Sequence, residues 1–119
     1  MQRKVTYNLH KFADCTDHES RKVHSFTIRT TDGTDEAWAA RRADSKGTGM
    51  TEELIRFSLV SYSIVEGEGS REISIAHPFE SFDKWSTKAR NFVVAAWKKL
   101  ATPDEADLAD FFANATEAE

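Results

Sequence analysis

The most constraining feature of this sequence is a long amphipathic segment in its C-terminal third. Its apolar residues recur every three or four positions, which is the period of an α-helix. They are Phe82, Trp85, Ala89, Phe92, Val93, Ala96, Trp97 and Leu100. Lysines mark the opposite side of this predicted helix. A helix with so wide an aromatic stripe must bury it against another layer of the protein.

Two pairs of alternating segments are predicted to supply that layer as antiparallel β-hairpins. Residues 5–12 and 23–30 alternate apolar with polar side chains, and a polar loop that we expect to be exposed joins them. Residues 60–64 and 71–76 alternate in the same way around a glycine-containing turn at 66–69. The predicted cross-strand partners are Tyr62 and Ile64 on one strand and Ile73 and Ile75 on the other.

Two helices are predicted between the hairpins. Residues 35–45 have high helix propensity, and Thr34 is the expected N-cap. Gly47 is expected to end this helix. The next helix is predicted to start at Thr51 and to give way to a strand near Val60, where the period of the apolar residues changes from helical to alternating.

Two further helices are predicted at the C-terminal end. Ser81 or Ser86 is expected to cap the long amphipathic helix, and a cap at Ser86 would make the preceding turn a separate short piece. In the last helix, Thr102 is the predicted cap, Pro103 the first helical residue and Glu105 the partner in a capping box.

These elements predict one α+β domain over residues 1–119, with a tail that frays from about residue 114. It consists of antiparallel β-hairpins packed with about four helices, and its C-terminal part is helical. A chain of 119 residues can bury a sizeable core without a metal or a disulfide.

Composition limits where such a protein works and what it binds. Cys15 is the only cysteine, so no intrachain disulfide can form, and a reducing intracellular compartment is favoured. We expect no secretory signal and no membrane helix, because no apolar run follows the basic start or approaches the roughly 18 residues that a membrane span needs. A net charge of −4 argues against a nucleic-acid partner.

The loop of residues 13–22 and its flanks carry the side chains that suggest a small metal- or thiol-dependent enzyme. His10, Cys15, His18 and His24 are of the types that bind zinc, but only Cys15 and His18 are closely spaced. Cys15 as a nucleophile with His18 as its base would lie in a charged loop without an apolar wall or a helix N-terminus to lower its pKa. We therefore predict no catalytic, cofactor-binding or metal-binding residue, and this enzyme stays an alternative.

Four aromatic residues near the C-terminus are the candidate partner-binding residues: Phe92, Trp97, Phe111 and Phe112. Packing in the core is the other interpretation. However, Phe111 and Phe112 are neighbours about 100° apart around one helix, so both cannot face the same core. Exposed apolar side chains mark contacts with a partner protein or with another copy of the chain.

The order of these elements resembles that of the tail assembly chaperones of long-tailed bacteriophages. The resemblance is carried by the segments TIRTTDGTDEAWAARRA, EELIRFSLVSYSIVEGEG, PFESFDKWSTKARNFVVAAWKKL and TPDEADLADFFANA. It is one of pattern and order over most of the chain. The polar stretch ADCTDHESRK in the first hairpin departs from it.

The resemblance implies a non-enzymatic viral protein that acts in the host cytoplasm. Such chaperones coat the long helical tape-measure protein, keep it dispersed and recruit tail-tube subunits, and they are absent from the finished virion. That role requires an apolar surface for amphipathic helices and an acidic exterior. The alternative within the same setting is a structural virion protein of the phage head–tail junction or tail, which would use the same surface for permanent contacts.

Overall fold

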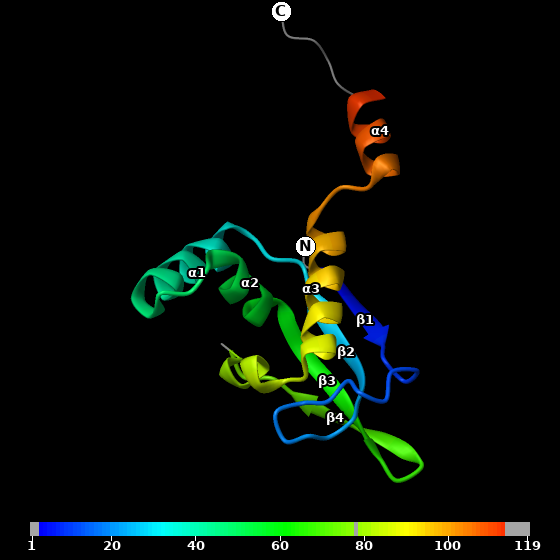
Figure 1. Ribbon diagram of the computed structural model, residues 1–119. Coiled ribbons are helices and arrows are strands. Elements are labelled where there is room, and N and C mark those ends of the chain that lie inside the picture. The colour runs from blue at the N-terminus through cyan, green and yellow to red at the C-terminus, as the bar shows by residue number, and fades with distance from the viewer. Residues whose placement is uncertain (1–2, 78, 114–119) are drawn as a thin grey trace, which may run out of the picture.

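The computed structural model describes residues 3–77 and 79–113, and it has an α+β architecture (Figure 1). Within these residues the strands are β1 Lys4–Asn8, β2 Val23–Arg29, β3 Leu59–Glu66 and β4 Gly69–Ser74. The helices are α1 Gly33–Lys46, α2 Met50–Ser58, the 3-10 helix η1 Glu80–Lys84, α3 Thr87–Ala101 and α4 Glu105–Ala113. The predicted fold class is confirmed.

The strands form one antiparallel sheet in the order β1-β2-β3-β4, in which β1 pairs with β2 and β3 with β4 as the two predicted hairpins require. Tyr62 lies opposite Ile73, as predicted. Of the four predicted partners only these two face each other, because Ile64 lies opposite Arg71. The reason is the tight turn around Gly67, whose φ of 61° is the left-handed conformation that glycine adopts without strain. That turn pairs residues 66 and 69 and thereby sets the register of the whole hairpin.

One face of the sheet is covered by η1 and α3, as the predicted apolar stripe requires (Figure 1). Trp85 is buried in this layer, and its ring lies 4.8 Å from that of Tyr62, centroid to centroid. The side chain of Ser86 accepts a hydrogen bond from the backbone N–H of Ala89 and caps α3. Of the two predicted caps Ser86 is therefore the one used, and the preceding turn is the separate helix η1.

The loop between β1 and β2 differs from its prediction. β1 ends at Asn8 rather than at residue 12, and the chain then turns inward at Leu9, which is buried. Cys15 and Asp17 are also buried, so the expectation of an exposed loop holds only for residues 13, 14, 19 and 20. The polar residues at 13–22 predict exposure to solvent, but several of their polar groups form hydrogen bonds inside the protein.

The N-termini of α1 and α2 lie near their predicted positions, but the caps differ. The carboxylate of Asp32 accepts hydrogen bonds from the backbone N–H groups of Thr34 and Asp35, so Asp32, not Thr34, is the cap. The Asp35 side chain accepts from the backbone N–H of Asp32 and completes a capping box. α2 begins at Met50, one residue before the predicted Thr51.

The cap predicted for the last helix is also wrong. Thr102 ends α3, and α4 begins only at Glu105. The capping hydrogen bonds are reciprocal ones between Asp104 and Asp107, whose carboxylates each accept from the other's backbone N–H. Pro103 thus lies in the connection between the two helices and not in the first turn of α4. An aspartate caps as well as a threonine, so the sequence pattern alone did not distinguish them.

No helix within residues 3–77 and 79–113 has both the length and the apolar composition needed to cross a membrane. The predicted fraying from residue 114 concerns a segment outside the described residues.

Candidate functional site

Helix α4 projects beyond the rest of the protein as the continuation of α3 (Figure 1). Every residue from 101 to 113 is exposed. The large apolar side chains on α4 are therefore uncovered: Leu108 is 42% exposed, Phe111 65% and Phe112 68%. The rings of Phe111 and Phe112 contact each other edge to face, with centroids 5.2 Å apart. The apolar side of α4 is thus available to another molecule.

Two adjoining hollows lie beside these side chains. The first, of about 480 Å³, lies between the end of α3 and α4 and is lined by Leu100, Ala101, Thr102, Pro103, Asp107, Leu108 and Phe111. The second, of about 320 Å³, lies beside Trp97 and is lined also by Arg29, Thr30, Thr31, Glu36, Leu54, Leu100 and Ala101. Because Leu100 and Ala101 line both, the two hollows adjoin at the end of α3.

The structure brings together three of the four predicted partner-binding residues. Phe111 lines the first hollow, half-buried Trp97 lines the second, and Phe112 is exposed next to Phe111. Phe92 lines neither hollow. It packs against the core, with its ring 4.5 Å from that of Phe12, centroid to centroid.

Two apolar residues of this surface were not predicted as binding residues. Leu100 was assigned to the stripe that faces the sheet, and Leu108 was not singled out, although its spacing of three from Phe111 places both on one side of a helix. We call the surface formed by Trp97, Leu100, Leu108, Phe111 and Phe112 the C-terminal surface.

Charge changes sign sharply along this part of the chain. α3 contains four basic residues and no acidic one, and Lys98 and Lys99 lie exposed at its end. Residues 102–113 contain four acidic residues and no basic one. Neither Lys98 nor Lys99 forms an ion pair with any other residue that the structure describes. The C-terminal surface is therefore flanked by positive charge at one end and by negative charge along α4.

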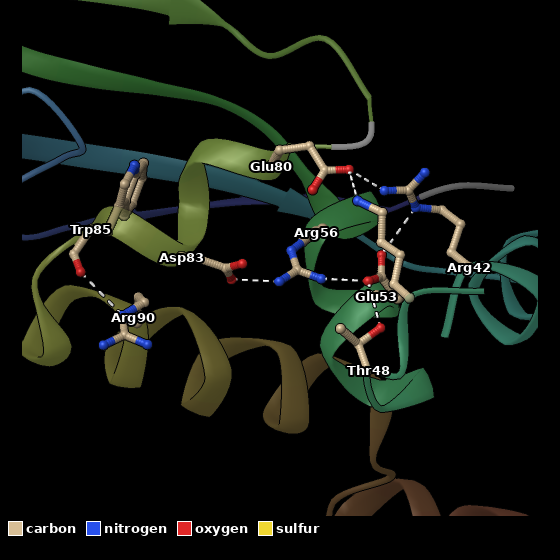
Figure 2. Close-up of polar contacts among 9 residues, drawn as sticks. Arg42, Thr48, Glu53, Arg56, Glu80, Asp83, Trp85 and Arg90 are labelled. Carbon is tan, nitrogen blue, oxygen red and sulfur yellow. Dashed lines mark hydrogen bonds and ion pairs between the residues drawn. The ribbon is translucent and has the colours of Figure 1, made fainter. Parts of the chain in front are cut away.

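A buried polar network forms the second concentration of functional groups (Figure 2). Its centre is Glu53, which is fully buried in α2. One carboxylate oxygen accepts hydrogen bonds from Arg56 Nη1 at 2.5 Å and Thr48 Oγ1 at 2.9 Å. The other accepts from Arg42 Nε at 3.1 Å. The carboxylate is thus satisfied by groups from α1, from α2 and from the connection between them.

The same network reaches η1. Arg56, only 4% exposed, also donates to Asp83, and Glu80 accepts from Arg42 and from Lys46. The hydrogen bond from Lys46 is the main cause of the lowered pKa of Glu80. With Glu53 included, three cationic side chains meet three carboxylates, so the cluster carries no excess charge. We interpret this cluster as the connection that fixes α1 and α2 to η1 and thereby to the body of the protein, which is the sheet with η1 and α3.

The side chain of Asp17 organises the loop between β1 and β2. It accepts hydrogen bonds from Tyr62 Oη at 3.0 Å and from Arg21 Nε at 2.9 Å. Burial by itself raises the pKa of Asp17, but the hydrogen bonds from Arg21, Glu19 and Tyr62 outweigh it, and the pKa is lowered. Burial, followed by the hydrogen bond to Asp17, raises the pKa of Tyr62 to about 12. These are structural contacts inside the fold.

Cys15 belongs to the core. Its side chain is fully buried, and burial raises the pKa of the thiol, which opposes formation of the nucleophilic thiolate. The expectation that no apolar wall lies near Cys15 is therefore wrong. His10 and His24 have ring centroids 6.3 Å apart. Over residues 3–77 and 79–113, no three His, Cys, Asp or Glu side chains are grouped so that they could hold a metal ion.

Comparison with known proteins identifies no related family, protein or structure. No protein-family model, no curated protein and no solved structure matches the chain. The resemblance to tail assembly chaperones therefore stays a prediction.

Proposed function

We propose that this chain is a non-enzymatic assembly chaperone of the phage-tail type. It binds an amphipathic helix of the tape-measure protein on its C-terminal surface, in the host cytoplasm, and helps to recruit tail-tube subunits. The observation that supports this proposal is that α4 exposes Leu108, Phe111 and Phe112. Contiguous exposed apolar side chains are typical of surfaces that bind another protein.

The shape of the C-terminal surface favours a helix as the bound segment. A depression along the end of α3 and the side of α4 suits recognition in which an amphipathic helix places its apolar face in a groove. The nine residues of α4 span about 13 Å, enough to follow two to three turns of a bound helix. A tape-measure protein, as the resemblance describes it, offers such helices repeatedly.

Charge defines the chemistry of the bound helix further. Because residues 102–113 carry four acidic and no basic side chains, we expect the bound helix to have basic residues beside its apolar stripe. The overall charge of −4 would keep the complex dispersed while its apolar surfaces are covered.

The proposal is tested by co-expression with a long helical tape-measure protein. We expect the chaperone to keep that protein in the soluble fraction and to elute with it in size-exclusion chromatography. The variant Phe111→Ser/Phe112→Ser should bind at least about tenfold more weakly, because it removes the main apolar anchors. Trp38→Ser is the matched control, since Trp38 is an aromatic residue of α1 that is also 54% exposed.

Two results would contradict the proposal. One is a tape-measure protein that stays equally insoluble with and without this chain. The other is equal binding by the Phe111→Ser/Phe112→Ser variant and the native chain. Mass spectrometry of purified particles separates the structural alternative, because a chaperone should be missing from them whereas a tail component should be present.

A further inference from the structure

The C-terminal surface is complementary in charge to a second copy of itself. Reading along the chain, the basic pair Lys98 and Lys99 is followed by the acidic residues of 104–110. When two identical segments lie antiparallel about a two-fold axis, the first part of each faces the last part of the other. The basic end of one copy then lies beside the acidic helix of the other, and the contact is made twice.

The apolar groups fit the same arrangement. The hollow of about 480 Å³ between α3 and α4 is lined by Leu100, Pro103 and Leu108, and nothing among the described residues fills it. Phe112, at the end of α4, is 68% exposed. When Lys98 and Lys99 of one copy lie beside the acidic residues of the other, each α4 lies along the end of the other copy's α3, where Leu100 lines that hollow. Each copy would therefore cover the other's apolar side.

The conformation of the connection shows why the chain does not cover α4 by itself. Thr102 has an extended backbone, with φ −105° and ψ 129°, and α4 continues away from α3 in Figure 1. Asp104 and Asp107 are held in the reciprocal cap that starts α4. The acidic helix thus points away from the lysines of its own chain, while those of a second copy can approach it.

We infer that, without a bound partner, two copies pair antiparallel through residues 98–113, and that the partner helix displaces the second copy. The pairing stands on the geometry and charge of this segment alone. The displacement rests on the proposed function. In this arrangement the exposed aromatic residues are covered until the partner is present, so self-association regulates the same surface.

Sedimentation equilibrium of the full chain over a wide range of concentration tests the pairing. We expect the mass to rise from 13.5 kDa toward twice that value. The variants Lys98→Glu/Lys99→Glu and Glu105→Lys/Asp110→Lys should each self-associate at least about tenfold more weakly, because each places like charges together at both contacts. A mixture of the two variants should restore the pairing, since opposite charges then meet again at both contacts.

Controls separate this result from general effects of charge and folding. Lys11→Glu/Lys84→Glu changes the net charge by the same amount as Lys98→Glu/Lys99→Glu but lies outside the C-terminal surface, and it should pair like the native chain. Circular dichroism of each variant checks that its helices form. The restored pairing in the mixture also requires two folded partners.

Three outcomes would overturn the inference: a monomer at every concentration, undiminished pairing by the charge-reversed variants, or no pairing in their mixture. Tape-measure binding is measured separately, with the protein at a concentration where it is monomeric. If the chain self-associates but does not bind the tape-measure protein, the proposed function is refuted and this inference is not. Binding of the partner without any self-association would refute this inference alone.

Discussion

The substitution Glu53→Gln tests whether the buried polar network fixes α1 and α2 to the body. Glu53 is fully buried and accepts hydrogen bonds from Arg42, Thr48 and Arg56. Glutamine keeps the shape but has one acceptor oxygen and an N–H₂ group that would face guanidinium donors. Arg56, itself only 4% exposed, would then keep Asp83 as its one hydrogen-bonded carboxylate among the described residues.

The expected cost is large for a single substitution. Removing one partner of a buried ion pair destabilises a protein by about 3–5 kcal/mol, because the other charge stays buried. We expect about 3 kcal/mol here, since Asp83 still compensates part of the charge of Arg56. With a urea dependence of about 2 kcal/mol per molar, the midpoint of unfolding should fall by about 1.5 M.

Urea unfolding followed by circular dichroism measures this change in the free energy of unfolding. Glu66→Gln is the matched control, because Glu66 pairs with Arg71 at 2.6 Å with side chains that are 59% and 53% exposed. Exposed pairs contribute less than about 1 kcal/mol. If Glu53→Gln were no more costly than Glu66→Gln, the interpretation of the network as the attachment of α1 and α2 would be refuted.

Three further predictions concern the loop, the sheet and α1. Because Cys15 is fully buried, a thiol reagent should modify it at least about a hundredfold more slowly in the native protein than in urea, and equal rates would place the thiol at the surface. Burial and Asp17 raise the pKa of Tyr62 to about 12 in the folded protein, above its ordinary value of about 10. The folded state then retains a proton that the unfolded state loses, so the free energy of unfolding should fall as the pH rises from about 10 to about 12, and Tyr62→Phe should remove this contribution in urea titrations across that range. Asp32→Ala should lower the free energy of unfolding by about 1 kcal/mol through loss of the α1 cap, whereas Thr34→Ala should not, and the reverse order in thermal unfolding would contradict the assigned cap.

The sheet and the long helix were predictable because burial imposes a period on the sequence. The alternation in both hairpins and the stripe that includes Phe82 and Trp85 correspond to side chains that are buried in the structure. Residues 13–22 carry no such period. Asp17 is buried because Tyr62 reaches it from β3, a strand distant in sequence, and neither composition nor spacing indicates that contact.

The candidate site was predictable to a similar extent. Two neighbouring aromatic residues cannot share one core, and Phe111 and Phe112 are indeed exposed. The hollows depend on the path of residues 102–104, which differs from the predicted one because Thr102 ends α3 and does not cap the last helix. The role of Glu53 was also missed, since a glutamate in the first turn of a helix is usually explained by the helix dipole, and its partner Arg42 lies in another helix.

The position of α1 and α2 between β2 and β3 has a consequence for how the chain folds. β2 and β3 are the two central strands, so their pairing must bring together segments separated by both helices. Compact helices shorten the distance that this connection has to close, which lowers the entropic barrier to long-range pairing. We therefore expect the contacts between α1 and α2 to form before β2 and β3 pair at the centre of the sheet. We also expect α4, which has few contacts with the other described elements, to have no part in the rate-limiting step of folding.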